Sequence, residues 1–540
     1  MFNLENLNIL VIDDFSEMRN TCRRMLMEYN PEAVDDCGNG DDAIEKMRRK
    51  KYDIVLCDYN LGEGKDGQQI LEEARYEGIL DFSSLFMVIT GENTRAMVMA
   101  AVEYEPDDYL TKPFTKEVLI KRLQRLIYRK QGLNLVGEAL AEKNYPKAIT
   151  LCDALSEKHP KNAINLLKVK GNILYLAEEY TKAAELYQSV LQQYSLPWAQ
   201  MGLGKVYFER GEYHEAKEIF STLLKESPNQ MDAYDWLART LEALGDPHQA
   251  QSILQKASDL SPNILVRRQH LADIAITNGD TDVAERACKA AVKLSKGSAF
   301  KRADDFTNLA KILVEQKRDQ KALQCLKQGR ENFAQQTDAL LKLAVSESEV
   351  HHAVNRQKPA VESLDKAKRL LSRKGEDDIS AAASLGLAEA CLRHGDKESG
   401  MEIMLDVIEN NHENEHFIAR AREAFNKAGL EKEGEKMVQN AITRIANINN
   451  EAAKLANNGK LDEAIELFVS AARKLPANKV VNLNAAQALI LDLQKNGCSD
   501  ERLLQCRRYL DNAKKQDASD RRYQQLAKKF SLLEKSCLHS

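Results

Sequence analysis

The sequence predicts two folds in one chain: a doubly wound α/β domain, followed by an all-α solenoid of helical repeats. Within residues 1–125, short apolar runs such as residues 8–12 and 54–57 each end on a polar or charged residue. After Lys130 the strand pattern stops, and alanines in similar contexts recur at a spacing near 34 residues. A chain of 540 residues is long enough for at least two domains.

Acidic residues follow two of the apolar runs. Asp13 and Asp14 come directly after residues 8–12, and Asp58 comes directly after residues 54–57. The carboxyl ends of parallel strands meet at one edge of a doubly wound sheet, which is where such sheets bind ligands. Three carboxylates there would suit a hard divalent cation, for which we expect Mg²⁺. A carboxylate beside such an ion can also accept a phosphoryl group.

Two further apolar runs end on groups that could bind phosphoryl oxygens. Residues 86–90 end on the hydroxyl of Thr90, and residues 108–113 end on Lys112 and a proline. In this order and at this spacing, the acidic pair, Asp58, Thr90 and Lys112 make residues 1–126 resemble the receiver domain of two-component response regulators. The resemblance implies an α/β flavodoxin-like fold with five parallel strands and five helices.

The resemblance also implies a role for each of these residues. Asp58 would be the phosphoacceptor, and Thr90 and Lys112 would contact the phosphoryl group. Mg²⁺ would be held by Asp13, Asp14, Asp58 and the backbone carbonyl of Asn60. The peptide bond between Lys112 and Pro113 would be cis.

Switching and loss of the phosphoryl group involve further positions of the resemblance. Thr90 and Tyr109 would form the switch pair, although an aromatic residue on a core strand is more often there for packing. Asn60 and Glu92 would tune dephosphorylation and favour a short-lived phosphoryl state, because small polar groups there can admit and orient water. Glu105 and Pro106 depart from the small pair usual in receivers, which puts the shape of that loop in doubt.

Helix signals fit the α/β domain. The second helix is expected to start at Asp41, the third to span residues 65–78, and the fourth to be capped by Asn93 or Thr94. The fifth should run from Thr115 into a helical connector at residues 127–135. Because the linker contains only one glycine, Gly132, the helix should enter the array directly or through a single break there.

The second part of the chain is repetitive. The recurring alanines are separated by 35, 33, 34, 34, 38 and 38 residues, at Ala148, Ala183, Ala216, Ala250, Ala284, Ala322 and Ala360. Two helices per unit at this period resemble tetratricopeptide repeats. We expect such repeats over residues 136–480, degenerate at 330–450, with capping helices at 481–540.

Charge and composition exclude several classes of protein. Residues 1–125 carry 16 Lys+Arg and 25 Asp+Glu, or −9, so the whole-chain value of −5 leaves −5 − (−9) = +4 for the remainder. That charge is too small to indicate nucleic-acid binding. The sequence has neither the basic n-region of a signal peptide nor an apolar run long enough to span a membrane. We therefore expect a cytoplasmic protein that does not bind membranes. The ten cysteines form no C-x-x-C pair and indicate no disulfide framework.

Two histidine patterns need a structural check. Residues 412–416 read H-E-N-E-H, as in zinc metalloproteases, but the flanking sequence is polar, so a solvated turn is the better interpretation. His351 and His352 are expected to be a pair on a helix surface.

The sequence lacks a P-loop, a kinase catalytic loop and a basic recognition helix. We therefore expect a response regulator phosphorylated by a histidine kinase or phosphotransfer protein, whose array binds a protein or peptide partner. It would be no enzyme beyond promoting its own phosphorylation and dephosphorylation. The alternatives are a phosphate sink or modulator of another kinase–regulator pair and, less favoured, a nucleic-acid-binding repeat protein. The oligomeric state stays open.

Overall fold

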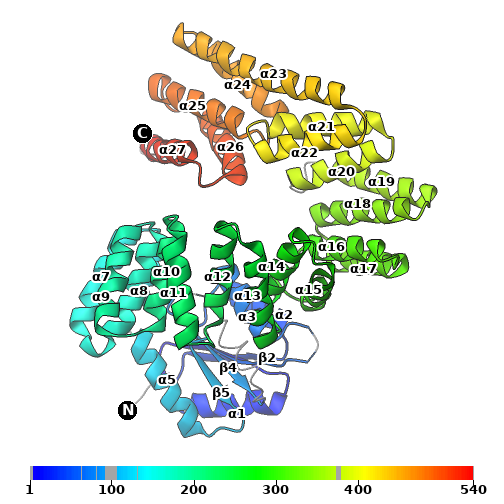
Figure 1. Ribbon diagram of the computed structural model, residues 1–540. Helices are drawn as coiled ribbons and strands as arrows, with labels where there is room; N and C mark the ends of the chain where they lie inside the picture. Colours follow the sequence, from blue (N-terminus) through cyan, green and yellow to red (C-terminus); the bar gives the residue numbers. More distant parts are fainter. Residues whose placement is uncertain are drawn as a thin grey trace. The chain divides into compact units, whose positions relative to one another are not determined.

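The computed structural model describes residues 4–62, 64–80, 82–91, 106–130, 132–372 and 379–538. By its internal contacts the chain divides into two compact units, Met1–Ile312 and Leu313–Ser540, and most of their elements are labelled in Figure 1. Across these described ranges, every helix is too short or too polar to cross a lipid bilayer.

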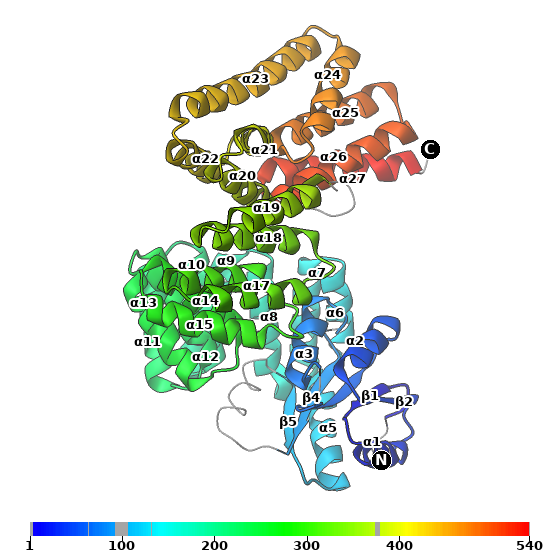
Figure 2. The ribbon, with the colours of Figure 1, turned by 90° about the vertical axis from the view of Figure 1, so that its right-hand side faces the viewer.

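The first unit contains a five-stranded parallel sheet, as predicted (Figure 2). Its order is β2-β1-β3-β4-β5, and every neighbouring pair is parallel. The chain passes from β1 outward to β2 and then back across to β3, so the direction of winding reverses between β1 and β3. A doubly wound sheet binds its ligands at this reversal point. The strands are β1 (Asn8–Ile12), β2 (Ala33–Cys37), β3 (Ile54–Asp58), β4 (Leu85–Thr90) and β5 (Asp108–Thr111).

Helices cover both faces of the sheet. On one face, α1 (Ser16–Met27) and α5 (Lys116–Lys130) pack against one set of strand side chains. On the other, α2 (Gly40–Arg49) and α3 (Gly67–Tyr76) pack against the alternate set. Strands buried on both faces read as continuous apolar runs, which explains the sequence pattern. The predicted fourth helix falls at positions outside the described residues.

Two local features position α3 beside the end of β3. Asp66 caps the helix by accepting from the backbone N–H of Gln69, and the Gln69 side chain accepts from the backbone N–H of Asp66, which forms a capping box. Gly67 allows close contact, because a Cβ there would lie 2.3 Å from the carbonyl oxygen of Asp58. The first turn of α3 is therefore pressed against the strand that ends on Asp58.

The link from sheet to array is short and has one break. Helix α5 ends at Lys130, and α6 (Asn134–Ala141) begins four residues later. Gly132 lies between them with φ of +85°, a left-handed conformation that glycine adopts without strain. Of the two arrangements that the sequence left open, the structure has the break at Gly132.

An array of antiparallel helices completes the first unit, whose boundary at Ile312 falls within the last of these helices. Glycines let the helices approach closely around large side chains: Cβ atoms at Gly171 and Gly202 would lie 2.6 and 2.3 Å from the ring of Tyr187. Small residues on one helix thus make room for a large side chain on its neighbour. The helices are α7 (Tyr145–Lys158), α8 (Ala163–Leu176), α9 (Tyr180–Gln193), α10 (Pro197–Glu209), α11 (Tyr213–Glu226), α12 (Met231–Ala243), α13 (Pro247–Leu260), α14 (Leu265–Thr277), α15 (Thr281–Leu294) and α16 (Ala303–Glu315), with the short 3₁₀ turn η1 (Pro160–Asn162) before α8.

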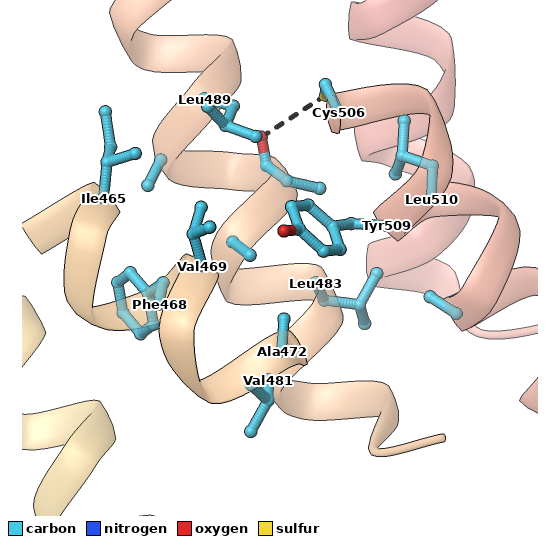
Figure 3. Close-up of a cluster of buried hydrophobic side chains, with 14 of the residues drawn as sticks. Ile465, Phe468, Val469, Ala472, Val481, Leu483, Leu489, Cys506, Tyr509 and Leu510 are labelled. Carbon is cyan, nitrogen blue, oxygen red and sulfur yellow. Dashed lines mark hydrogen bonds between the residues drawn. The ribbon is translucent and has the colours of Figure 1, made fainter. Parts of the chain in front are cut away.

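In the described part of the second unit, all the regular secondary structure is helical. Its last helices enclose a core of leucine, valine, alanine and aromatic side chains, part of which is shown in Figure 3. Over the stretch where the repeat signal fades, three helices are longer than those of the regular repeats, with 17 residues in α18, 16 in α19 and 27 in α23. They are α17 (Asp319–Asn332), α18 (Thr337–Ala353), α19 (Gln357–Ser372), α20 (Ala381–Arg393), α21 (Lys397–Asn410), α22 (Glu415–Lys427), α23 (Glu431–Asn457), α24 (Leu461–Lys474), α25 (Lys479–Asn496), α26 (Asp500–Gln516) and α27 (Arg521–Leu538).

One disulfide was not expected from the sequence. Cys498, just after α25, is bonded to Cys537 near the end of α27, 39 residues further on. The other eight cysteines are reduced and buried. The two cysteines are far apart in sequence and form no recognisable motif. They meet only because the fold of the last three helices brings them together.

Two of the histidines in the sequence patterns are more enclosed than the sequence indicated. His352 stacks on His394 with ring centroids 4.3 Å apart, so it is not a plain surface residue. His412 is half-buried, and its Nδ1 lies 3.0 Å from the side-chain nitrogen of Asn478. Residues 410–416 line a cavity of about 450 Å³ together with the start of α25 and the end of α26. Residues 413–416 are exposed and follow a turn, so the interpretation of this stretch as a solvated turn holds except at His412.

Candidate phosphorylation site

Three carboxylates meet at the carboxyl edge of the sheet. Asp13 and Asp14 follow β1, Asp58 ends β3, and these two strands are direct neighbours. One oxygen from each carboxylate lies within 4.8 Å of the others. Asp13 and Asp58 are only 3% and 6% exposed, whereas Asp14 faces solvent. Among the described residues, no other group of three or more His, Cys, Asp or Glu side chains has this geometry.

Lys112 reaches this cluster from the carboxyl end of β5, the last strand of the sheet. Its Nζ donates to Asp13 Oδ2 at 2.8 Å and to Asp58 Oδ2 at 2.7 Å. Lys112 follows β5, and its peptide bond to Pro113 is cis. The backbone N–H of Lys112 donates to the carbonyl of Thr90 at 2.7 Å, which joins the ends of β4 and β5. One ammonium is thus shared between two buried carboxylates.

Burial and charge perturb both partners of this ion pair. Burial raises the pKa of Asp58, and the charge of Asp13 raises it further, while Lys112 only partly offsets these effects. Burial alone would lower the pKa of Lys112, but its hydrogen bonds to Asp13 and Asp58 raise it overall. Burial is thus the main cause of the raised pKa of Asp58, whereas the two neighbouring carboxylates raise the pKa of Lys112.

The donor set fits a divalent cation. With all groups ionised, three carboxylates and one ammonium give −3 + 1 = −2, which one divalent ion would neutralise. Oxygen ligands at a partly solvated site are what Mg²⁺ prefers, since it keeps several of its waters. Asp14, being exposed, could bind the ion through water or directly.

The remaining predicted residues lie near this edge, with one exception. Thr90 ends β4 and is 2% exposed, and Tyr109 on β5 packs against the core beside α2 and α3. Asn60 is exposed two residues after Asp58, and its Oδ1 accepts from the backbone N–H of Gly62. Glu92 lies outside the described residues.

Arg19 is a residue of this site that the sequence analysis missed. From the second turn of α1, its Nη1 donates to the backbone carbonyls of Asp13 at 2.7 Å and Asp14 at 3.2 Å. Its Nε donates to Asp36 on β2 at 2.9 Å. Arg19 therefore fixes the loop that carries the acidic pair. An arginine on a polar helix gives no sequence signal for this role.

Comparisons with known proteins agree with this architecture. Residues 9–124 match the family model described as the response regulator receiver domain. Residues 174–240 and 232–264 match two tetratricopeptide repeat models. The chain therefore has an N-terminal response regulator receiver domain followed by tetratricopeptide repeats.

Individual relatives match only part of the chain. Regulatory protein VanRB of Enterococcus faecalis is 33% identical over 128 residues, which are 24% of this chain and 56% of that protein. The chain thus spans about half the length of that relative. Chemotaxis protein CheY-3 of Vibrio cholerae is 28% identical over 125 residues, 23% of this chain and 95% of that protein.

A solved structure resembles part of the array. It is YrrB, described as a TPR protein with an unusual peptide-binding site. It shares 24% sequence identity and covers 35% of this chain and 95% of its own, with a TM-score of 0.28. The tetratricopeptide assignment rests on the family matches and the helix pattern, not on this superposition.

Proposed function

We propose that this chain is a response regulator that accepts a phosphoryl group on Asp58 and signals by protein–protein contact through its repeat array. The observation that carries the proposal is the meeting of Asp13, Asp14, Asp58 and Lys112 at the carboxyl edge of the sheet. The donor would be a histidine kinase or phosphotransfer protein.

The chemistry assigned to the site is one transfer step. An Asp58 carboxylate oxygen attacks phosphorus, the P–N bond of a phosphohistidine breaks, and the imidazole nitrogen keeps the bonding electrons and takes up a proton. Bound Mg²⁺, held by Asp13, Asp14, Asp58 and the backbone carbonyl of Asn60, would supply positive charge for the phosphoryl oxygens. Lys112 would transfer its hydrogen bond from Asp58 to a phosphoryl oxygen, and Thr90 would donate its hydroxyl to another.

The array offers a surface suited to a protein partner. On α12, Trp236 has Arg239 5.0 Å from its ring on one side, and Lys205 of α10 lies 5.3 Å from the same ring. Aromatic residues and arginine are enriched where proteins bind one another. Consecutive first helices of repeats line one side of such an array, which is where these arrays bind peptides.

The proposed output is tested by affinity capture with the full-length protein. The bait is used with and without excess acetyl phosphate and Mg²⁺, and captured proteins are identified by mass spectrometry. We expect a protein whose recovery depends on phosphorylation and falls with Arg239→Glu and Lys205→Glu together. The matched control is Lys225→Glu, an exposed lysine on the other helix of a repeat.

The identity of the captured protein separates the alternatives. A kinase or second regulator as the main captured protein would favour the phosphate-sink or modulator function. Nucleic acid retained with a steep dependence on salt would favour the nucleic-acid alternative. If recovery of the captured protein changes neither with the phosphodonor nor with the two substitutions, the proposed output is wrong.

A further inference from the structure

The connection between α15 and α16 is longer than its counterparts. Its eight residues, 295–302, compare with three or four between α9 and α10, between α11 and α12, and between α13 and α14. This is where the alanine spacing lengthens from 34 to 38, between Ala284 and Ala322. Extra residues within a repeat usually map to a loop on one face, often a functional one.

The extra residues form an ordered loop. Ser298 accepts from the backbone N–H of Phe300 at 3.1 Å, and its own N–H donates to Ser295. Gln269 of α14 donates to the carbonyl of Phe300 at 3.0 Å, and Arg302 pairs with Asp273 at 2.9 Å. The array itself therefore holds residues 296–300 in place.

This loop contacts the receiver along α3. Gln69 Nε2 donates to the carbonyl of Lys296 at 3.0 Å, and the Ser298 hydroxyl donates to Glu72 Oε2 at 3.3 Å. Phe300 meets Tyr76 edge to face, with ring centroids 5.1 Å apart. Residues 69, 72 and 76 are spaced along one face of the helix, so the loop follows that face for two turns.

The contact continues to the phosphoacceptor loop. A cavity of about 310 Å³ has Tyr59, Asn60 and Gln69 on the receiver side, and Asn263, Leu294 and Ser298 on the array side. Asn60 is two residues from Asp58, and α3 begins with Gly67 pressed against the carbonyl of Asp58. The array thus forms one wall of the space beside the phosphorylation site.

We propose that the loop of residues 296–300 is an intramolecular latch on α3 that is closed in the unphosphorylated protein and released by phosphorylation of Asp58. This inference rests on the proposed function and adds the route by which the receiver controls the array. In this structure Lys112 is bound to Asp58 itself.

Charge sets the direction of the switch. The closed contact leaves Glu72 only 8% exposed, and Ser298 is 4% exposed against it. A phosphoryl group adds negative charge and strong acceptor oxygens at the head of the segment that leads into α3. Keeping Glu72 away from water then costs more, and any movement of the loop after Asp58 is passed on through Gly67. Phosphorylation therefore favours the open contact.

Thiol labelling of Ser298→Cys in the full-length protein tests the latch. Ser195→Cys is the matched control, since Ser195 lies exposed in the shorter loop between α9 and α10. The eight native free cysteines are buried and give a low background with a maleimide. We expect slow labelling at position 298 and a rise of about five-fold or more with excess acetyl phosphate and Mg²⁺. Position 195 should react quickly under both conditions.

The outcomes distinguish this inference from the proposed function. Fast labelling at 298 without phosphodonor, or slow labelling that stays unchanged while intact mass shows phosphorylation, would overturn the latch alone. Absence of the phosphorylated mass would overturn the proposed function itself.

Reciprocity provides a second test. In Ser298→Asp the new carboxylate would face Glu72, and the repulsion between them should open the latch. If phosphorylation of Asp58 opens the latch, then opening the latch by substitution must in turn favour phosphorylation. Ser298→Asp should therefore raise the phosphorylated fraction at limiting acetyl phosphate, whereas Ser195→Asp should not. An equal or lower fraction for Ser298→Asp would contradict the coupling.

Discussion

The Nζ of Lys112 lies 2.7 Å from Oδ2 of Asp58, although 54 residues separate the two in sequence. The same nitrogen lies 2.8 Å from Asp13, so one ammonium serves two buried carboxylates. This arrangement keeps Asp58 oriented but leaves the site with excess negative charge. A site of this kind suits a divalent cation.

Asp58 should lower the stability of the metal-free protein at neutral pH. Because its pKa is raised in the folded state, Asp58 favours folding only while it is protonated, and this contribution is lost as pH rises through the raised pKa. Asp58→Asn should then raise the free energy of unfolding at pH 7 by about 1–2 kcal/mol, with a smaller gain near pH 4. Lys112 keeps Asp13 as a partner in this variant.

Calorimetric scans in chelator at the two pH values measure this effect. Added Mg²⁺ should stabilise the wild type more than the variant, because it binds the folded site. If the wild type is as stable as Asp58→Asn at pH 7 without Mg²⁺, ionised Asp58 does not destabilise the folded protein, and this prediction is wrong.

Asn60 should shorten the life of the phosphoryl group. It is exposed two residues after Asp58 and lines the cavity beside the phosphoacceptor loop. Asn60→Arg fills this space with a bulky cation, so loss of phosphate should slow by about ten-fold. The effect should be smaller than the roughly 100-fold that a general base contributes, because an amide only orients the water. Decay is followed by intact mass after the phosphodonor is removed. Equal half-lives of wild type and variant would rule out this role.

A titration of free thiols tests the disulfide between Cys498 and Cys537. In denaturant without reductant, eight thiols should titrate, and ten should titrate after reduction. Closing a loop of 39 residues stabilises the last helices by about 4 kcal/mol in the chain-entropy estimate. Reduction should therefore lower the unfolding temperature of the C-terminal unit. Ten thiols before reduction would show that the bond does not form in solution.

Much of the architecture could be predicted because the signals are local. Apolar runs that end on Asp13, Asp58 or Thr90 indicate parallel strands, and the alanine period indicates paired helices. Arg19 and the Cys498–Cys537 bond escaped prediction because they depend on where the fold brings distant segments. The latch residues gave a partial signal, since the repeat lengthened at that point, but the sequence did not indicate what the extra residues contact.

Phosphorylation of Asp58 is the claim on which the rest of the account depends. Full-length wild type and Asp58→Asn are incubated with acetyl phosphate and Mg²⁺, and intact mass is recorded over time. The account predicts that the wild type gains one phosphoryl group, that chelation of Mg²⁺ suppresses this gain, and that Asp58→Asn gains none while remaining folded. Equal labelling of the two proteins would contradict it.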